Sequence, residues 1–222
     1  ILLLLLSLVG VSQSYVQWWN VQQEVKSCPT LVKVLPLGTG AAQVAGDTMA
    51  LSLTSFTNGN LMVVHAARNE SSTFSMSGWT TSSSRDGTGL STTVFYKIKT
   101  PSDVLVKLVS SANTTTNLFA ALYEFSGVNQ TSPTANETNI GEFVGSLYSN
   151  SLTTSTAYSL GVLFWATRDD SPSATFSGTG SITFSSSAFN NLITSAKALP
   201  GTTTFIPSFV PSRLSRLIDI LY

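Results

Sequence analysis

Short apolar and alternating runs fill the chain after Cys28, separated by Gly, Asn, Ser, Thr and Pro. Runs bounded by turn residues in this way are the period-2 signal of strands in an antiparallel sandwich. No segment beyond residue 28 has the length and spacing of a long amphipathic helix. The pattern therefore predicts a mainly β body with strands at residues 48–56, 61–67, 92–99, 103–110, 118–125, 142–148, 159–167, 181–187, 192–198 and 214–222.

Two parts of this body resemble each other. "NLMVVHAARNESS" from Asn60 is similar to "SLGVLFWATRDDS" from Ser159, which places Leu61 over Leu160 at an offset of 99 residues. The same offset pairs Leu118 with Leu217. Each half alone would leave its apolar face exposed, so we expect the halves to close on one another. The prediction is a single two-sheet antiparallel sandwich of jelly-roll type over residues 45–222, preceded by a connector at 28–44.

The first 27 residues follow a different pattern, with a continuous apolar start and then a stripe. "LLLLLSLVGV" is apolar almost throughout, and apolar or aromatic residues then recur at spacings of three and four, as on one face of a helix. A signal peptide is one interpretation, but no basic region precedes the apolar run. A membrane anchor is another, but a span needs about 20 apolar residues.

We therefore predict one N-terminal hydrophobic helix over residues 1–27, which is retained and packs against copies of itself or a membrane. A helix of 26 residues is about 39 Å long. Such a helix requires full burial where it is apolar all round and one-sided burial where it is striped. The predicted assembly residues are Leu2, Leu3, Leu4, Leu5, Leu6, Leu8, Val9, Val11, Tyr15, Trp18, Trp19 and Val25.

Composition points to a protein outside the cell with a hydroxyl-rich surface. Only 10% of the residues are charged, against roughly 25% in ordinary soluble domains. The 11 basic and 11 acidic residues balance, so no basic field attracts phosphates and no nucleic-acid partner is expected. Cys28 is the single cysteine, which excludes an internal disulfide. Four Asn-x-Ser/Thr sequons predict surface glycans at Asn69, Asn113, Asn129 and Asn136.

Residues that could carry chemistry are few. His65 alternates with apolar neighbours, and no second histidine exists to complete a triad or a metal site. "RDG" at 85–87 and "RDD" at 168–170 predict turns, with a calcium site as the alternative. Four aromatic residues on strands or at their ends predict core packing, with a carbohydrate platform as the alternative: Trp79, Tyr96, Phe125 and Trp165. We expect no catalytic residue, cofactor or metal, and no enzyme.

The body resembles a β-sandwich domain common in secreted bacterial and archaeal surface proteins and in phage structural proteins. The similarity rests on the succession "AGDTMALSLTSF", "NLMVVHAARNESS", "SMSGWTTSSS", "TTVFYKIKTPSDVLVKL" and "NLFAALYEFSGVNQTSP". It covers about residues 45–222. Its motifs are turn and core residues, so the resemblance implies a fold and is silent on activity.

The Leu-rich start and the aromatic exit in "SYVQWWN" resemble the mature subunits of archaeal type IV pili and archaella. That resemblance implies a helix that is first held in a membrane and then bundled in a filament core. The leading hypothesis is accordingly a structural subunit of an extracellular, cell-surface filament. The alternative is a virion structural protein, such as a spike, minor capsid or tail subunit, and a carbohydrate-binding adhesin is the third.

Overall fold

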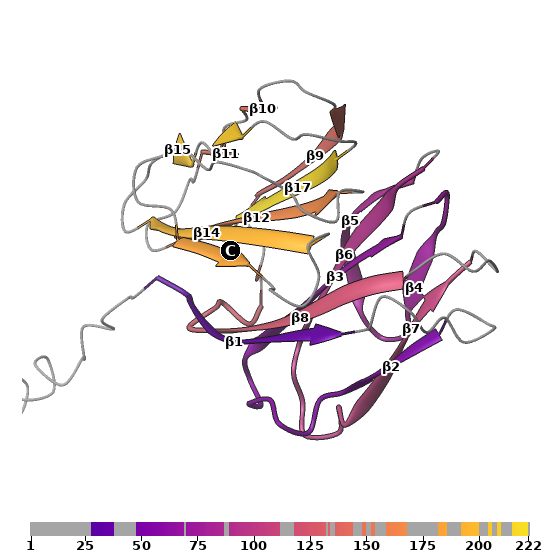
Figure 1. Ribbon diagram of the computed structural model, residues 1–222. Coiled ribbons are helices and arrows are strands. Elements are labelled where there is room, and N and C mark those ends of the chain that lie inside the picture. Colours follow the sequence, from indigo (N-terminus) through magenta and orange to yellow (C-terminus); the bar gives the residue numbers. More distant parts are fainter. Residues whose placement is uncertain are drawn as a thin grey trace, which may run out of the picture.

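The computed structural model in Figure 1 covers the β body. Beyond residue 135, side chains are described at positions 160–162, 164 and 166. The predicted N-terminal helix lies outside the described residues, which are 28–37, 48–68, 70–86, 89–111, 118–131, 133, 136–143, 148–149, 152–153, 159–167, 182–185, 192–199, 204–205, 208–209 and 215–221.

Every regular element among the described residues is a strand, and every pairing is antiparallel. The prediction of a mainly β, antiparallel sandwich is confirmed. The strands are β1 Thr30–Leu37, β2 Thr48–Ser52, β3 Leu61–Arg68, β4 Phe74–Met76, β5 Thr80–Arg85, β6 Ser91–Ile98, β7 Leu105–Ser110, β8 Leu118–Ser126, β9 Asn136–Phe143, β10 Tyr148–Ser149, β11 Leu152–Thr153, β12 Ser159–Thr167, β13 Ile182–Ser185, β14 Leu192–Leu199, β15 Thr204–Phe205, β16 Ser208–Phe209 and β17 Ser215–Leu221.

Three sheets of three or more strands form the described body. The central sheet has five strands in the order β1-β8-β3-β6-β5, and a second five-stranded sheet has the order β13-β14-β12-β17-β9. A third sheet has three strands in the order β2-β7-β4. The strands β10 and β16 form one short pair, and β11 and β15 form another.

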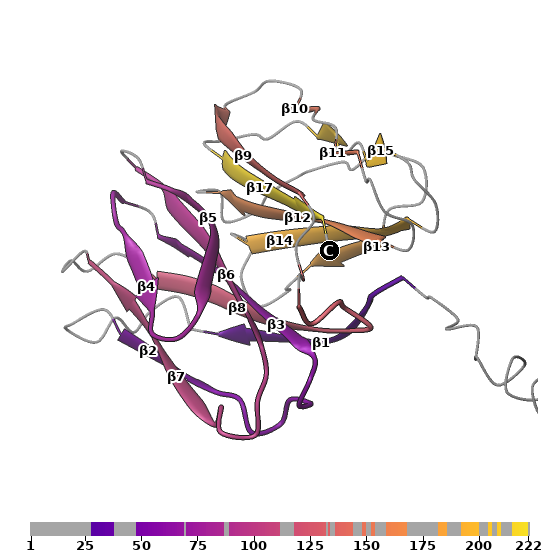
Figure 2. The same cartoon turned by 180° about the vertical axis from the view of Figure 1, so that it is seen from behind.

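The central sheet is covered on both faces, which is visible from both sides of the molecule (Figures 1 and 2). Every residue of β3 is buried. Its odd-numbered residues, such as Val63, pack in one core with β12, whereas its even-numbered residues, such as Val64, pack in a second core with β2, β4 and β7. Alternate residues of a strand point to opposite faces. A strand between two cores must therefore be apolar at nearly every position, as "LMVVHAAR" is.

The two five-stranded sheets share one topology. The second sheet can be written as β9-β17-β12-β14-β13. Its strands then have the same relative order along the chain as the strands of β1-β8-β3-β6-β5. The sheets pack with β5 near β9, β6 near β17 and β8 near β14. The counterpart of β6 is β14 and the counterpart of β8 is β17, so each of β6 and β8 contacts the counterpart of the other. This crossed packing is that of two similar units related by a two-fold axis through β3 and β12.

Two expectations from the sequence need correction. Residues 28–44 were expected to be a connector outside the sandwich, whereas residues 30–37 form β1, the edge strand of the central sheet. A single two-sheet sandwich was also expected, whereas the central sheet lies between two others. Its apolar residues on both faces can be covered only by two further layers.

Candidate functional site

The chain enters the body at the start of β1, directly after the predicted assembly segment. Pro29 is buried, and Thr30 pairs with Ser126 of β8 through a 2.9 Å contact between their hydroxyl oxygens. Gly127, which follows β8, has a φ of 74°, a conformation that favours glycine. A Cβ at this position would lie 3.7 Å from the Cα of Pro29, so the backbone after β8 lies beside the start of the described chain. All twelve predicted assembly residues lie outside the described residues. The body end to which that segment is joined is thus fixed to the central sheet.

The four predicted glycan acceptors differ in their surroundings. Asn129 is exposed after β8, and its side-chain oxygen accepts a hydrogen bond of 3.0 Å from the backbone N–H of Thr131. Asn136 opens β9 and pairs with Leu221, and its side chain is outside the described residues. Asn69 and Asn113 also lie outside them. Asn129 is therefore the sequon for which the structure gives an exposed acceptor.

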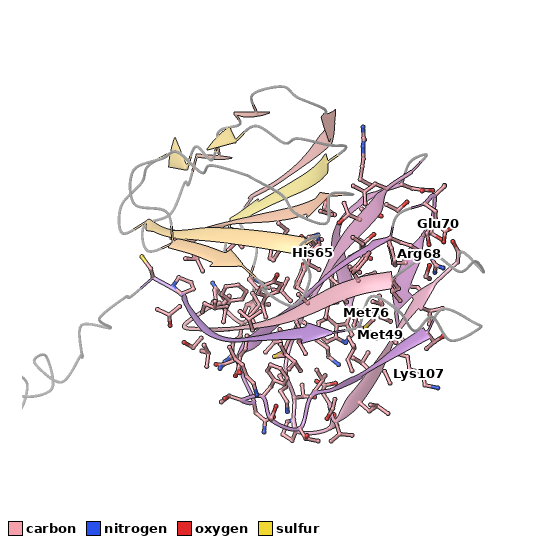
Figure 3. The ribbon with its side chains drawn as sticks, viewed as in Figure 1. Met49, His65, Arg68, Glu70, Met76 and Lys107 are labelled. Carbon is pink, nitrogen blue, oxygen red and sulfur yellow. The ribbon has the colours of Figure 1, made fainter. Side chains whose placement is uncertain are left out.

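A polar cluster closes the end of β3 opposite to the chain entry. The buried guanidinium of Arg68 donates to the hydroxyl of Ser110 at 3.0 Å and pairs with the carboxylate of Glu70 (Figure 3). The carboxylate of Asp86, in the "RDG" run, accepts from the backbone N–H of Ser72 at 3.0 Å. These groups hold neighbouring strand ends together. Within the described part of the chain, no three His, Cys, Asp or Glu side chains gather into a metal site.

The described aromatic residues considered for a carbohydrate platform are fully or partly buried. Trp79 packs against the core shared with β2, β4 and β7. Tyr96 packs against the other core, and Phe125 belongs to it. The side chain of Trp165 is outside the described residues. Trp79 and Tyr96 pack against opposite cores, so they do not share one face of the central sheet as a platform.

The outer face of the three-stranded sheet and the turn before β7 carry exposed aliphatic side chains. Leu105 is 59% exposed, Val104 54% and Val109 38%. Lys107 points away from the body from the same strand, whereas Met49 and Met76 lie between the sheets (Figure 3). A shallow hollow of about 570 Å³ on this face is lined by Ser75, Ser77, Leu105, Val106, Lys107 and Val109. This surface therefore brings hydroxyl, ammonium and aliphatic groups together at one place.

Over the described ranges, no helix has the length and apolar character of a membrane span. No protein-family model matches the chain, and neither a curated protein nor a solved structure matches it.

Proposed function

We propose that this protein is a structural subunit of an extracellular helical filament, polymerising through residues 1–27 with the β body exposed. The observation that carries the proposal is the apolar start, in which five consecutive leucines are followed by a one-sided stripe. Its partners are copies of itself, with membrane contact through the same segment before assembly. No cofactor or catalytic residue is needed, because the mechanism is burial of apolar surface.

The energetics favour assembly over a free helix. Burying one leucine side chain gains roughly 1.5–3 kcal/mol, so the leucine run gives a large gross gain that ordering and association costs then reduce. Direct entry of the chain into β1 supports this role, because a helix held in a filament would set the position of the whole central sheet. Few surface charges also suit closely spaced copies, since like-charge repulsion between them is small.

A virion structural protein is the second candidate, and the strand order favours it. The order β1-β8-β3-β6 facing β2-β7-β4 resembles a jelly roll in which one strand has changed sheets. That strand is β5, which pairs with β6 in the central sheet and not with β4. Jelly rolls serve viral capsid and lectin domains. The corresponding order in the second five-stranded sheet supports a body built from two such units. In a virion, residues 1–27 would enter a membrane or a neighbouring subunit.

The test is Leu5→Asp, compared with Ser102→Asp in the exposed turn before β7. In a helix, Leu5 is about 31 Å from Lys26, the nearest basic residue along the segment. An unpaired buried carboxylate costs several kcal/mol in every copy, so electron microscopy should show no assembled particle for Leu5→Asp. The Ser102 variant should assemble normally, and circular dichroism should show a folded β body for both. Normal assembly of Leu5→Asp would refute the proposal.

A further inference from the structure

His65 lies at the centre of the contact between the two five-stranded sheets. Its ring is fully buried, and its centroid is 5.4 Å from that of Phe164 in β12, with the ring planes at 60°. Under the alignment that places Leu61 over Leu160, His65 corresponds to Phe164, since 65 plus 99 is 164. Two corresponding residues touch each other only near a two-fold axis. The one histidine of the chain therefore lies where the two units meet.

The hydrogen bonds of the ring leave one nitrogen without a partner. Nε2 lies 2.9 Å from the hydroxyl oxygen of Thr92, and that hydroxyl donates its proton to the carbonyl of Ala66 at 3.0 Å. The Thr92 oxygen must then accept, so Nε2 carries the ring proton and Nδ1 is a bare acceptor. Nδ1 is buried and has no hydrogen-bond partner.

The described side chains around the ring offer no counter-charge to a protonated imidazole. On β12 they are apolar, and the titratable groups that share this core from β6 and β8 are the phenols of Tyr96 and Tyr123. Glu124 and Arg68 occupy even-numbered positions and face the opposite side of the central sheet. The other strands of the β12 sheet carry charged residues whose side chains are outside the described residues: Lys197 in β14, Arg216 and Asp219 in β17, and Glu137 and Glu142 in β9.

Burial of the ring lowers the pKa of His65 from 6.5 to about 3. A folded-state pKa below the exposed value means that any state exposing the ring binds more protons. The free energy that favours the state with the ring buried is therefore largest above pH 6.5 and decreases as the pH falls from 6.5 towards 3.

We propose that His65 makes the contact between the central sheet and the sheet of β12 acid-sensitive. Protonation of the ring drives β12 away from β3 and opens the core around Phe164 to water. The core on the other face of β3 stays closed, because its apolar residues on β3, Met62, Val64 and Ala66, do not titrate. The buried Glu124 and Arg68 on that face are already held by hydrogen bonds and an ion pair. The inference is independent of the proposed filament role, since it concerns the body alone.

Neighbouring residues of β3 provide a matched pair of probes for this opening. Cys28 is the only native cysteine, so Val63→Cys and Val64→Cys are each placed in a full-length Cys28→Ser chain. Both valines are fully buried, Val63 towards β12 and Val64 towards the three-stranded sheet. Labelling rates with an aromatic disulfide are measured at pH 7.5 and 4.5. Each rate is divided by that of the same variant unfolded in urea at the same pH.

The normalised rate for Val63→Cys should be about 100-fold higher at pH 4.5 than at pH 7.5. The equilibrium constant for opening increases about tenfold for each pH unit below 6.5. The rate for Val64→Cys should stay unchanged. Adding His65→Phe should abolish the acid response at Val63→Cys, and His65→Gln serves if the phenylalanine variant does not fold. An equal rise at both probes, or a rise that persists without His65, would overturn the proposal.

A second measurement uses the native chain. The nuclear magnetic resonance signals of the sole histidine should show Nε2 protonated at pH 7 and no titration down to pH 5 in the folded protein. A titration midpoint near 6.5 in the folded protein would mean that the ring is solvated, and it would also overturn the proposal.

Discussion

Replacing Phe164 by alanine tests the layered architecture directly. Phe164 is fully buried, and its ring centroid lies 5.4 Å from those of His65 and Tyr123, both on the central sheet. Truncating a buried phenylalanine typically costs 3–5 kcal/mol, because transfer energy is lost and a cavity remains. Each edge-on aromatic contact contributes a further ~0.5–1.5 kcal/mol beyond area burial. Because these aromatic contacts add to the truncation cost, we expect Phe164→Ala to lower the free energy of unfolding by about 5 kcal/mol, the upper end of the usual range.

Urea denaturation followed by circular dichroism measures this loss, with two controls. Leu122→Ala removes a fully buried side chain from the opposite face of the central sheet and should cost about 2–5 kcal/mol. Val104→Ala, at a position that is 54% exposed, should change stability by about 0.5 kcal/mol or less. A loss below about 1 kcal/mol for Phe164→Ala, with a normal loss for Leu122→Ala, would show that β12 does not cover the central sheet.

Two further predictions concern the N-terminal segment and a surface sequon. Deleting residues 1–27 should leave a soluble, folded, all-β monomer, because both described cores are made of residues beyond 28; circular dichroism and size exclusion measure this, and an aggregated or unfolded product would contradict it. Asn129 should carry a glycan in native material, because its sequon is exposed; peptide mass mapping with Asn129→Gln as control measures this, and an unmodified peptide would refute it.

The strands that could be predicted from the sequence are those with apolar residues at most positions. The run at 159–167 coincides with β12, and the run at 61–67 is one residue shorter than β3. Both lie at the centre of a five-stranded sheet, and the core between the two sheets buries one face of each. Such positions require a dense apolar run, and the run itself marks the strand.

The strands that were missed have weak local signals and depend on their partners. The strand β5, "TTSSSR", is made of hydroxyls and one charge, and it extends only because β6 pairs with it at the sheet edge. The strand β1 contains Pro36 and an irregular register between Leu31 and Lys33, which are features of an edge strand. Hydrophobic periodicity alone cannot identify the pairing partner of a strand, so it predicts a loop at β5 and a connector at β1.

The sequence similarity between the two halves does not predict the strand register of the second sheet. In the central sheet Val63 pairs with Tyr123, and in the second sheet Val162 pairs with Ile220. An offset of 99 residues would instead have paired Val162 with Tyr222. The difference is two residues, which keeps every side chain on the same face of the sheet. Burial therefore preserves the alternation while the register itself is set by the neighbouring strands.

The class of the body, the positions of its central strands and the paucity of titratable groups follow from local periodicity and composition, so they can be obtained from the amino-acid sequence. The three-dimensional fold is needed to establish that the central sheet lies between two layers and that β1 belongs to it. It also placed the lone histidine against its counterpart Phe164 with one nitrogen unpaired. Those features depend on contacts between residues about 100 positions apart, and no local pattern of a chain specifies which distant strand will cover a given face.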